Sequence, residues 1–199
     1  MNFYLKNFDL KTLEKAKSIQ LLILDIDGVL TNGQLDLDDN LITSKTFHVR
    51  DGFGIRQLLK EGIEIAVITG RESKLVIERI RELKINYLFQ NCPDKLPVFQ
   101  KLLSQLNLSP DQVAYMGDDL IDLPIMSKVG LSAAPSDAYP FVREQADFVS
   151  SYPGGNGAVR EFCDLILESK SRLQTICEQF LIDGSELPKD QQKQQTKKI

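Results

Sequence analysis

The stretch LLILDIDGVLT, residues 21–31, decides the fold. Apolar residues run into Asp25, Asp27 and Gly28, a pattern typical of a buried strand that feeds a loop. Two carboxylates at the end of such a strand are costly to bury unless a cation compensates them. We therefore expect both at the carboxyl end of a sheet strand, with a divalent cation as partner; a plain acidic turn is the alternative.

The bulk composition narrows the class of protein. A chain of 199 residues with 42% hydrophobic and 26% charged residues suits one globular domain. The net charge of −4 argues against nonspecific binding of nucleic acid. Three scattered cysteines without metal-ligand spacing indicate a reducing compartment. Since no apolar run is long enough for a membrane span and the start lacks a signal core, we predict a cytoplasmic protein that has no membrane partner.

Strand and helix patterns alternate along the rest of the chain. Residues 33–49 alternate in polarity about Asp39 and Asn40, which predicts a β-hairpin. The expected strands are 21–24, 63–68, 86–90, 113–116, 130–134 and 147–149, and the expected helices are 51–61, 73–83, 97–106, 120–128, 138–145 and 158–169. This order predicts an α/β fold with a doubly wound, mostly parallel sheet. We expect one domain over residues 1–182, with the hairpin as an insertion after the first strand, and a disordered tail at 183–199.

Polar groups follow the ends of several expected strands. Thr69 comes directly after the second sheet strand, Lys95 follows the third, and Asp118 and Asp119 follow the fourth. Each has an ordinary alternative: a simple turn around Thr69, a solvated lysine, and a helix cap at the acidic pair. Because the carboxyl ends of parallel strands share one edge, we expect these groups to converge with the carboxylates of the first strand.

Phosphoryl transfer needs such a set of groups. Its transition state spreads negative charge over the phosphoryl oxygens, so catalysis consists of positioning and cations. Asp25 fits a nucleophile that forms an acyl phosphate, and Asp27 fits the acid and base. Asp118 fits a ligand of the Mg²⁺ that must bridge two anionic reactants. The Thr69 hydroxyl and the Lys95 ammonium fit groups that hold the phosphoryl oxygens.

The combined pattern resembles the haloacid-dehalogenase superfamily of phosphatases over roughly residues 20–165. The matching motifs are Asp25-x-Asp27-x-Val29, Thr69, Lys95 and Gly117-Asp118-Asp119-x-x-Asp122. The resemblance implies an Mg²⁺ held by Asp25, by Asp118 and by the main-chain carbonyl of Asp27. It also implies supporting roles for Asp119 and Asp122. Members often carry a cap domain, but the short spacings between the motifs leave no room for one here.

Within that superfamily, the chain is similar to the family of 3-deoxy-D-manno-octulosonate 8-phosphate (KDO 8-phosphate) phosphatases. The matching segments are DIDGVLTNG (25–33), HVRDGFGIR (48–56), ITGR (68–71), GDDLIDLPIM (117–126) and GGNGAVREFCDLIL (154–167). The resemblance implies a capless homotetramer that removes phosphate from an eight-carbon keto-sugar acid on the path to lipopolysaccharide. It implies a substrate site made of Asp27, His48, Val49, Arg50, Asp51, Gly52, Arg56, Arg71, Arg79 and Lys95. Arginines suit a substrate that carries both a phosphate and a carboxylate.

Other interpretations of the same residues stay open. Arg79 fits an exposed helix face equally well, and His48 fits the end of a strand without any contact to substrate. A phosphatase of nine-carbon keto-sugar acids resembles the chain almost as well. A phospho-accepting receiver domain also gathers Asp, Thr and Lys at a sheet edge, but its acceptor lies on a middle strand, whereas Asp25 follows the first. A catalytically silent assembly module would not need the full acidic set.

Overall fold

A computed structural model describes residues 8–38 and 41–183 of the chain. Its main sheet has six strands in the order β5-β4-β1-β6-β7-β8, and every pair of neighbours is parallel. The strands are β1 (Leu21–Leu24), β4 (Glu64–Ile68), β5 (Tyr87–Phe89), β6 (Val113–Met116), β7 (Leu131–Ala134) and β8 (Phe148–Val149). The expected α/β fold with a parallel sheet is therefore confirmed.

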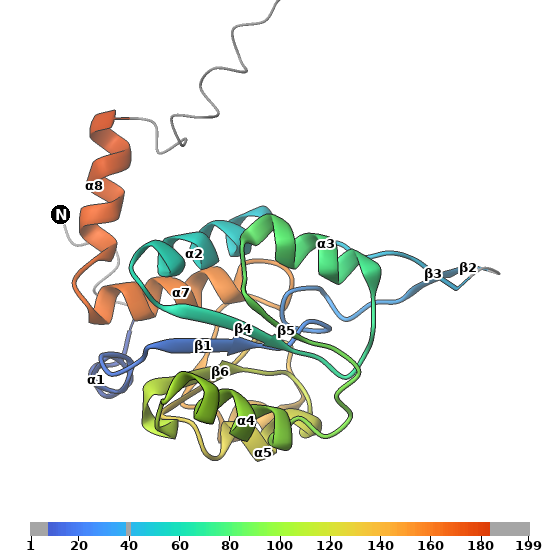
Figure 1. The fold of residues 1–199 in the computed structure, drawn as a ribbon. Helices are drawn as coiled ribbons and strands as arrows, with labels where there is room; N and C mark the ends of the chain where they lie inside the picture. Colours follow the sequence, from blue (N-terminus) through green and yellow to red (C-terminus); the bar gives the residue numbers. More distant parts are fainter. Residues whose placement is uncertain (1–7, 39–40, 184–199) are drawn as a thin grey trace, which may run out of the picture.

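Helices cover both faces of this sheet (Figure 1). The helices of the described residues are α1 (Leu10–Ala16), α2 (Val49–Lys60), α3 (Lys74–Leu83), α4 (Leu96–Leu106), α5 (Leu123–Met126), α6 (Pro140–Gln145), α7 (Ala158–Ser169) and α8 (Leu173–Asp183), of which α8 extends away from the sheet (Figure 1). Two 3₁₀ turns, η1 (Pro110–Gln112) and η2 (Leu120–Asp122), lie on either side of β6. Helices α2, α3 and α7 share one apolar core, while α4, α5 and α6 share the other.

The central strand β1 is completely buried because its residues alternate between the two cores. Leu22 and Leu24 pack into the core of α2 and α7, and Leu21 and Ile23 pack into the core of α4 and α5. Burying each such side chain stabilises the fold by about 1.5–3 kcal/mol. Strand β1 therefore has a fixed position, and the turn after Leu24 begins from a rigid point.

The order of the strands places a crevice beside β1. The chain first extends the sheet from β1 through β4 to β5 and then returns to add β6 on the other side of β1. Such a reversal leaves an opening at the carboxyl ends of the two strands that flank it. The turns after β1 and β6 therefore face each other across the place where ligands bind in open α/β sheets.

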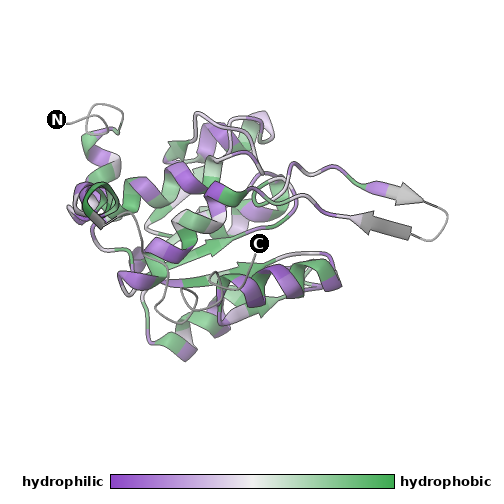
Figure 2. Ribbon diagram, turned by 90° about the horizontal axis from the view of Figure 1, so that it is seen from above, coloured by the Kyte–Doolittle hydropathy of each residue, from purple (hydrophilic) through white to green (hydrophobic). Residues whose placement is uncertain are grey.

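A separate two-stranded antiparallel sheet forms the expected hairpin. Strands β2 (Asp36–Asp38) and β3 (Leu41–Ser44) project from the body at the carboxyl edge of the main sheet (Figure 2). The return strand ends at Ser44, so the prediction that the hairpin continues to Val49 is wrong. Helix α2 correspondingly starts at Val49, ahead of the expected Asp51, with His48 as its N-cap.

The helices are interrupted at two places. The helix expected over 120–128 is split into η2 and the short α5, and Pro124 stands at the start of α5 because proline suits a first helical turn. Helix α7 ends at Ser169, as predicted, and α8 begins as a separate helix at Leu173 after Ser171 takes a positive φ of 55°. Asp183 is the last residue of α8. The expected domain limits and the predicted tail reach into residues 1–7 and 184–199, outside the described part of the chain.

Candidate active site

Asp25 is the first residue after β1, and its carboxylate is buried. Only 5% of Asp25 is exposed, and its backbone N–H donates to the carbonyl of Met116 at the end of β6, 3.1 Å away. The Nζ of Lys95 donates to Oδ1 of Asp25 at 2.6 Å. Burial raises the pKa of Asp25 to about 6, although Lys95 acts in the opposite direction. Asp25 is thus a carboxylate that is held by one cation and still short of compensating charge.

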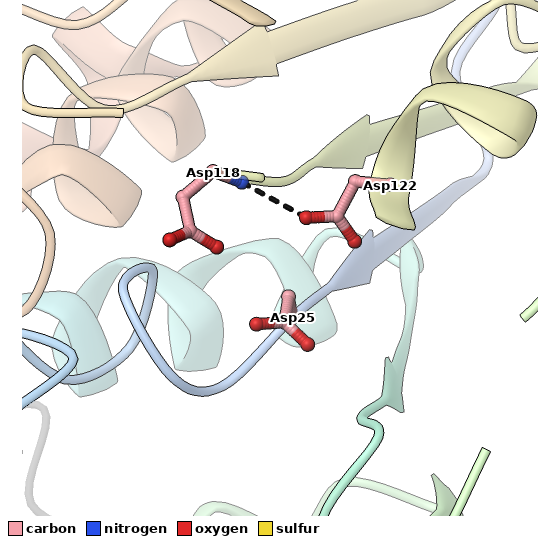
Figure 3. Close-up of side chains that lie close together, drawn as sticks. All are labelled: Asp25, Asp118 and Asp122. Carbon is pink, nitrogen blue, oxygen red and sulfur yellow. Dashed lines mark hydrogen bonds between the residues drawn. The ribbon is translucent and has the colours of Figure 1, made fainter. Parts of the chain in front are cut away.

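Asp118 lies across the crevice, directly after β6 and Gly117. One oxygen from each of Asp25, Asp118 and Asp122 lies within 4.8 Å of the others (Figure 3). Burial, followed by the charges of Asp25 and Asp122, raises the pKa of Asp118 to about 8. A Cβ on Gly28, which has a φ of +96°, would lie 2.0 Å from Oδ2 of Asp118, so only glycine fits there. This crowding of carboxylates fits a hard divalent cation with oxygen ligands.

Both carboxylate oxygens of Asp122 accept hydrogen bonds from groups around the turn that follows β6. Its Oδ1 accepts hydrogen bonds from Lys95 Nζ at 2.7 Å and from the Tyr115 hydroxyl at 2.6 Å. Its Oδ2 accepts from the backbone N–H of Asp118 at 3.0 Å (Figure 3) and from that of Asp119 at 3.2 Å. Both oxygens of Asp122 are therefore engaged, which leaves Asp25 and Asp118 as the side chains available to a metal ion.

Lys95 joins the two halves of the crevice. It is 2% exposed at the start of α4, and its ammonium bridges Asp25 and Asp122. Burial alone would lower the pKa of Lys95, but the two carboxylates raise it above its ordinary value. The hydroxyl of Tyr115 lies 3.3 Å from the same ammonium. The sequence predicted Lys95 from its place after a strand, whereas Tyr115 is indistinguishable from a core residue of β6.

Thr69 occupies the same edge of the sheet, one strand away. Strands β1 and β4 pair with Leu24 opposite Val67, so Thr69 follows β4 at the level of the turn that contains Asp25. Thr69 is 2% exposed, and its hydroxyl accepts a hydrogen bond of 3.5 Å from the backbone N–H of Arg71. The structure thus brings Asp25, Thr69, Lys95 and Asp118 to one edge, as expected.

Asp27 has a partner that the sequence did not indicate. The ammonium of Lys45, which follows β3, forms an ion pair with Oδ1 of Asp27. The Lys45 side chain is only 3% exposed, and that of Asp27 is 20% exposed. No motif or spacing distinguishes Lys45 from an ordinary hairpin lysine, because its role depends on how the hairpin returns to the body.

Residues 48–52, at the start of α2, contact Arg79 and the beginning of α7. Arg79 Nη2 donates to the carbonyl of His48 at 3.4 Å, and a Cβ on Gly52 would lie 2.5 Å from the same nitrogen. Asp51 is 1% exposed and accepts from the backbone N–H groups of Gly157, at 3.3 Å, and Arg160, at 2.8 Å. Burial raises the pKa of Asp51. Its carboxylate therefore fastens α2 to the start of α7.

The other residues expected at the substrate site are exposed at the surface: Val49, Arg50, Arg56 and Arg71. Among the described residues, no hydrogen bond or ion pair joins these four to the carboxylates of Asp25, Asp118 and Asp122. Arg50 lines a cavity of about 290 Å³ beside the start of α7, together with Asn156, Gly157 and Arg160.

A glycine-rich loop braces the catalytic turn from behind. A Cβ on Gly154 would lie 1.8 Å from the carbonyl oxygen of Gly28, and the N–H of Gly155 donates to the carbonyl of Val29 at 2.9 Å. The backbones of the two loops are therefore in direct contact, which only glycine allows. Residues 153–157 thus help to fix the turn that contains Asp25 and Asp27.

Comparison with known proteins agrees with this geometry. The model of the haloacid dehalogenase-like hydrolase family matches residues 88–162. The KDO 8-phosphate phosphatase KdsC of Escherichia coli K12 is 50% identical over 161 residues, which cover 81% of this chain and 86% of that protein. The fold and the acidic crevice thus define a haloacid dehalogenase-like hydrolase.

Solved structures give the same relationship. The KDO 8-phosphate phosphatase of Yersinia pestis is 45% identical, with a TM-score of 0.81 over 83% of this chain and 89% of that one. The enzyme of Moraxella catarrhalis, solved with magnesium, phosphate and KDO, is 36% identical, with a TM-score of 0.83 over 85% of this chain and 98% of that one. The chain belongs to the KDO 8-phosphate phosphatase family.

None of the helices in the described part of the chain is long and apolar enough to cross a membrane.

Proposed function

We propose that the protein is an Mg²⁺-dependent phosphatase that hydrolyses KDO 8-phosphate to KDO and phosphate. The observation that carries this proposal is the buried arrangement of Asp25, Lys95 and Asp118 at the crevice of a chain from this family. Asp25 and Asp118, with the main-chain carbonyl of Asp27, would hold the metal ion. When bound, the ion supplies the positive charge that lets an anionic nucleophile approach an anionic phosphate.

Each step of the proposed reaction is assigned to particular side chains. An oxygen of Asp25 attacks phosphorus and forms an aspartyl phosphate, while Asp27 donates a proton to the departing sugar oxygen. Water, activated by Asp27, later attacks the same phosphorus and releases phosphate. Thr69 and Lys95 hold the phosphoryl oxygens during both steps. Lys95 is already fixed by Asp122 and Tyr115, so the positive charge needs little rearrangement when the substrate arrives.

Substrate recognition would use the segment from His48 to Gly52 with the arginines around it. Arg79 contacts the backbone of this segment, and Arg56 and Arg71 add exposed guanidinium groups that can bind a carboxylate or a phosphate. The substrate proposed here belongs to lipopolysaccharide precursor synthesis, which is consistent with the predicted cytoplasmic location. All three cysteines, Cys92, Cys163 and Cys177, are free.

A homotetramer is part of the proposal. Within residues 8–38 and 41–183 no cap domain covers the crevice, and the hairpin projects from its edge (Figure 2). Hairpins of neighbouring subunits that pair with one another would close their open strand edges and wall the crevice against water. This arrangement would place parts of two subunits around each substrate.

The proposed reaction is tested by phosphate release from a panel of sugar phosphates, with Mg²⁺ and with a chelator. The expected result is strong preference for KDO 8-phosphate and no turnover in chelator; preference for a nine-carbon keto-sugar acid would change the substrate but not the chemistry.

Asp25→Asn and Asp27→Asn should both lose turnover, but only Asp27→Asn should still trap beryllium fluoride as a phosphate mimic. Asp147→Asn, which removes an ion pair with Lys15, serves as the remote control. Equal trapping on both active-site variants would contradict the roles.

A further inference from the structure

The side chain of Lys45 is buried beside the proposed acid and base. The residue follows β3 directly, where the hairpin returns to the body, and its side chain is 3% exposed. Its ammonium forms an ion pair with Oδ1 of Asp27 in the turn after β1. A lysine is almost never buried to this extent unless it is paired. The hairpin is therefore anchored to the catalytic turn through this ion pair.

The crevice thus contains two lysine–carboxylate pairs with different origins. Lys95 holds Oδ1 of Asp25 from the start of α4, on the side of the sheet that carries α4 and α5. Lys45 holds Oδ1 of Asp27 from the hairpin. The Asp25 pair is explained by phosphate binding, because Lys95 would contact the phosphoryl oxygens. The Asp27 pair has no explanation in the steps described so far.

We propose that Lys45 is a positioning residue that controls the orientation of the Asp27 carboxyl group. The proposal rests on the phosphatase reaction above. In its first step, the bond between Asp25 and phosphorus forms, the bond between phosphorus and the sugar oxygen breaks, and that oxygen takes a proton from Asp27. With Oδ1 engaged by Lys45, the proton is carried on Oδ2, which is the oxygen presented to the leaving group. Without Lys45 the carboxyl group of Asp27 can rotate, so in a smaller fraction of bound complexes its proton is directed at the leaving oxygen.

The test compares leaving groups that do and do not need a proton. An alkyl oxygen, as in a sugar phosphate, must be protonated as it leaves, whereas p-nitrophenolate leaves without help. The rate of leaving-group release in a single turnover is measured with Mg²⁺ for KDO 8-phosphate and for p-nitrophenyl phosphate. Lys45→Met should lower this rate by about 30-fold for the sugar phosphate and by less than about threefold for the aryl phosphate. The KM for the sugar phosphate should change by less than about threefold.

Three further variants control for local damage. Lys45→Arg keeps a charged donor and should restore the sugar phosphate rate to within about fivefold. Lys45→Gln is less demanding for folding, but its shorter and uncharged side chain cannot reach the Asp27 carboxylate as the ammonium does, so it should show the same imbalance as Lys45→Met. Lys15→Met removes the remote ion pair with Asp147 and should leave both rates unchanged. Thermal unfolding of each variant shows that the rates are compared between folded proteins.

Several results would overturn the proposal. Equal losses with the two substrates would mean that Lys45 has only a structural role. A large rise in KM with an unchanged rate would mean that Lys45 binds the substrate instead of positioning Asp27. If the unaltered protein released leaving group from neither substrate, the phosphatase function itself would be wrong, a result that is distinct from a selective failure of the Lys45 variants.

Discussion

At the scale of single residues, the buried hydroxyl of Tyr115 allows a direct test of the network around Lys95. Tyr115→Phe should lower the free energy of unfolding by about 1–2 kcal/mol, because Oδ1 of Asp122 loses a donor in a buried position. It should also lower kcat several-fold, because Lys95 is then held less firmly. Urea denaturation and steady-state kinetics measure the two effects.

Tyr139→Phe is the matched control for that substitution. Tyr139 lies close to the same turn, where its backbone N–H donates to the carbonyl of Asp118, but its side chain is 53% exposed. Removal of its hydroxyl should change neither stability nor kcat. A similar loss in both variants would show that the turn is sensitive to any nearby change and that Tyr115 has no particular role.

Residues that follow strands were predictable, and residues that act across the fold were not. Asp25, Thr69 and Asp118 each come directly after an apolar run, so strand ends alone bring them together. Lys45 and Tyr115 escaped prediction because their partners are set by the hairpin's return path and by the register of a core strand. Physical proximity of this kind is not encoded in any short spacing.

At the scale of elements, the hairpin is predicted to decide both assembly and activity. Replacing residues 36–43 by a short Gly-Ser link removes the paired strands but keeps Lys45. We expect a monomer that has lost about tenfold or more of its sugar phosphate activity, because the crevice stays open to water. Light scattering and phosphate release measure the two properties.

Helix α8 provides the control for assembly through another surface. Its residues Leu181 and Ile182 are 85% and 81% exposed, so α8 also offers an apolar surface for association. Leu181→Ser combined with Ile182→Ser should leave the assembly and the activity of the protein unchanged. If this variant dissociated while the hairpin variant stayed assembled, the subunit interface would lie on α8 and not on the hairpin.

The alternating elements were predicted closely, but the ends of the hairpin were not. Core strands such as β1 and β6 are marked by short apolar runs, and the body encloses them on both faces. The return strand ends at Ser44 because the chain turns inward there: Lys45 pairs with Asp27, and His48 occupies the N-cap position of α2. The polarity pattern continues to Val49, so the sequence overestimated the length of the strand.

At the scale of the whole molecule, the crowded carboxylates predict how stability depends on pH. In the metal-free protein, burial raises the pKa of Asp118 to about 8 and that of Asp25 to about 6, from an ordinary value of 3.8. The folded state therefore retains protons that the unfolded chain has already released. Stability from these groups is complete below about pH 4 and is lost as the pH rises through 6 and 8.

Thermal unfolding in chelator should therefore show a fall in stability, on the order of a few kcal/mol, between pH 5 and pH 8.5. Added Mg²⁺ should stabilise the protein more at pH 8.5 than at pH 5, because it no longer competes with protons. Asp118→Asn should remove most of the fall above pH 6, while Asp111→Asn, at the opposite edge of the sheet, should not. A flat profile for the unaltered metal-free protein would refute the prediction.

The contact between Gly154 and Gly28 has a consequence for how the protein is made. The ribosome synthesises the catalytic turn early, but the loop that braces it and the strand β6 that completes the crevice emerge much later. The nascent chain therefore carries its nucleophile on a turn with nothing behind it, and long-range contacts of this kind form slowly. Catalytic competence should therefore arise only after residues 153–157 have emerged and packed against the turn, so that shorter nascent chains held on ribosomes contribute no activity to the cell.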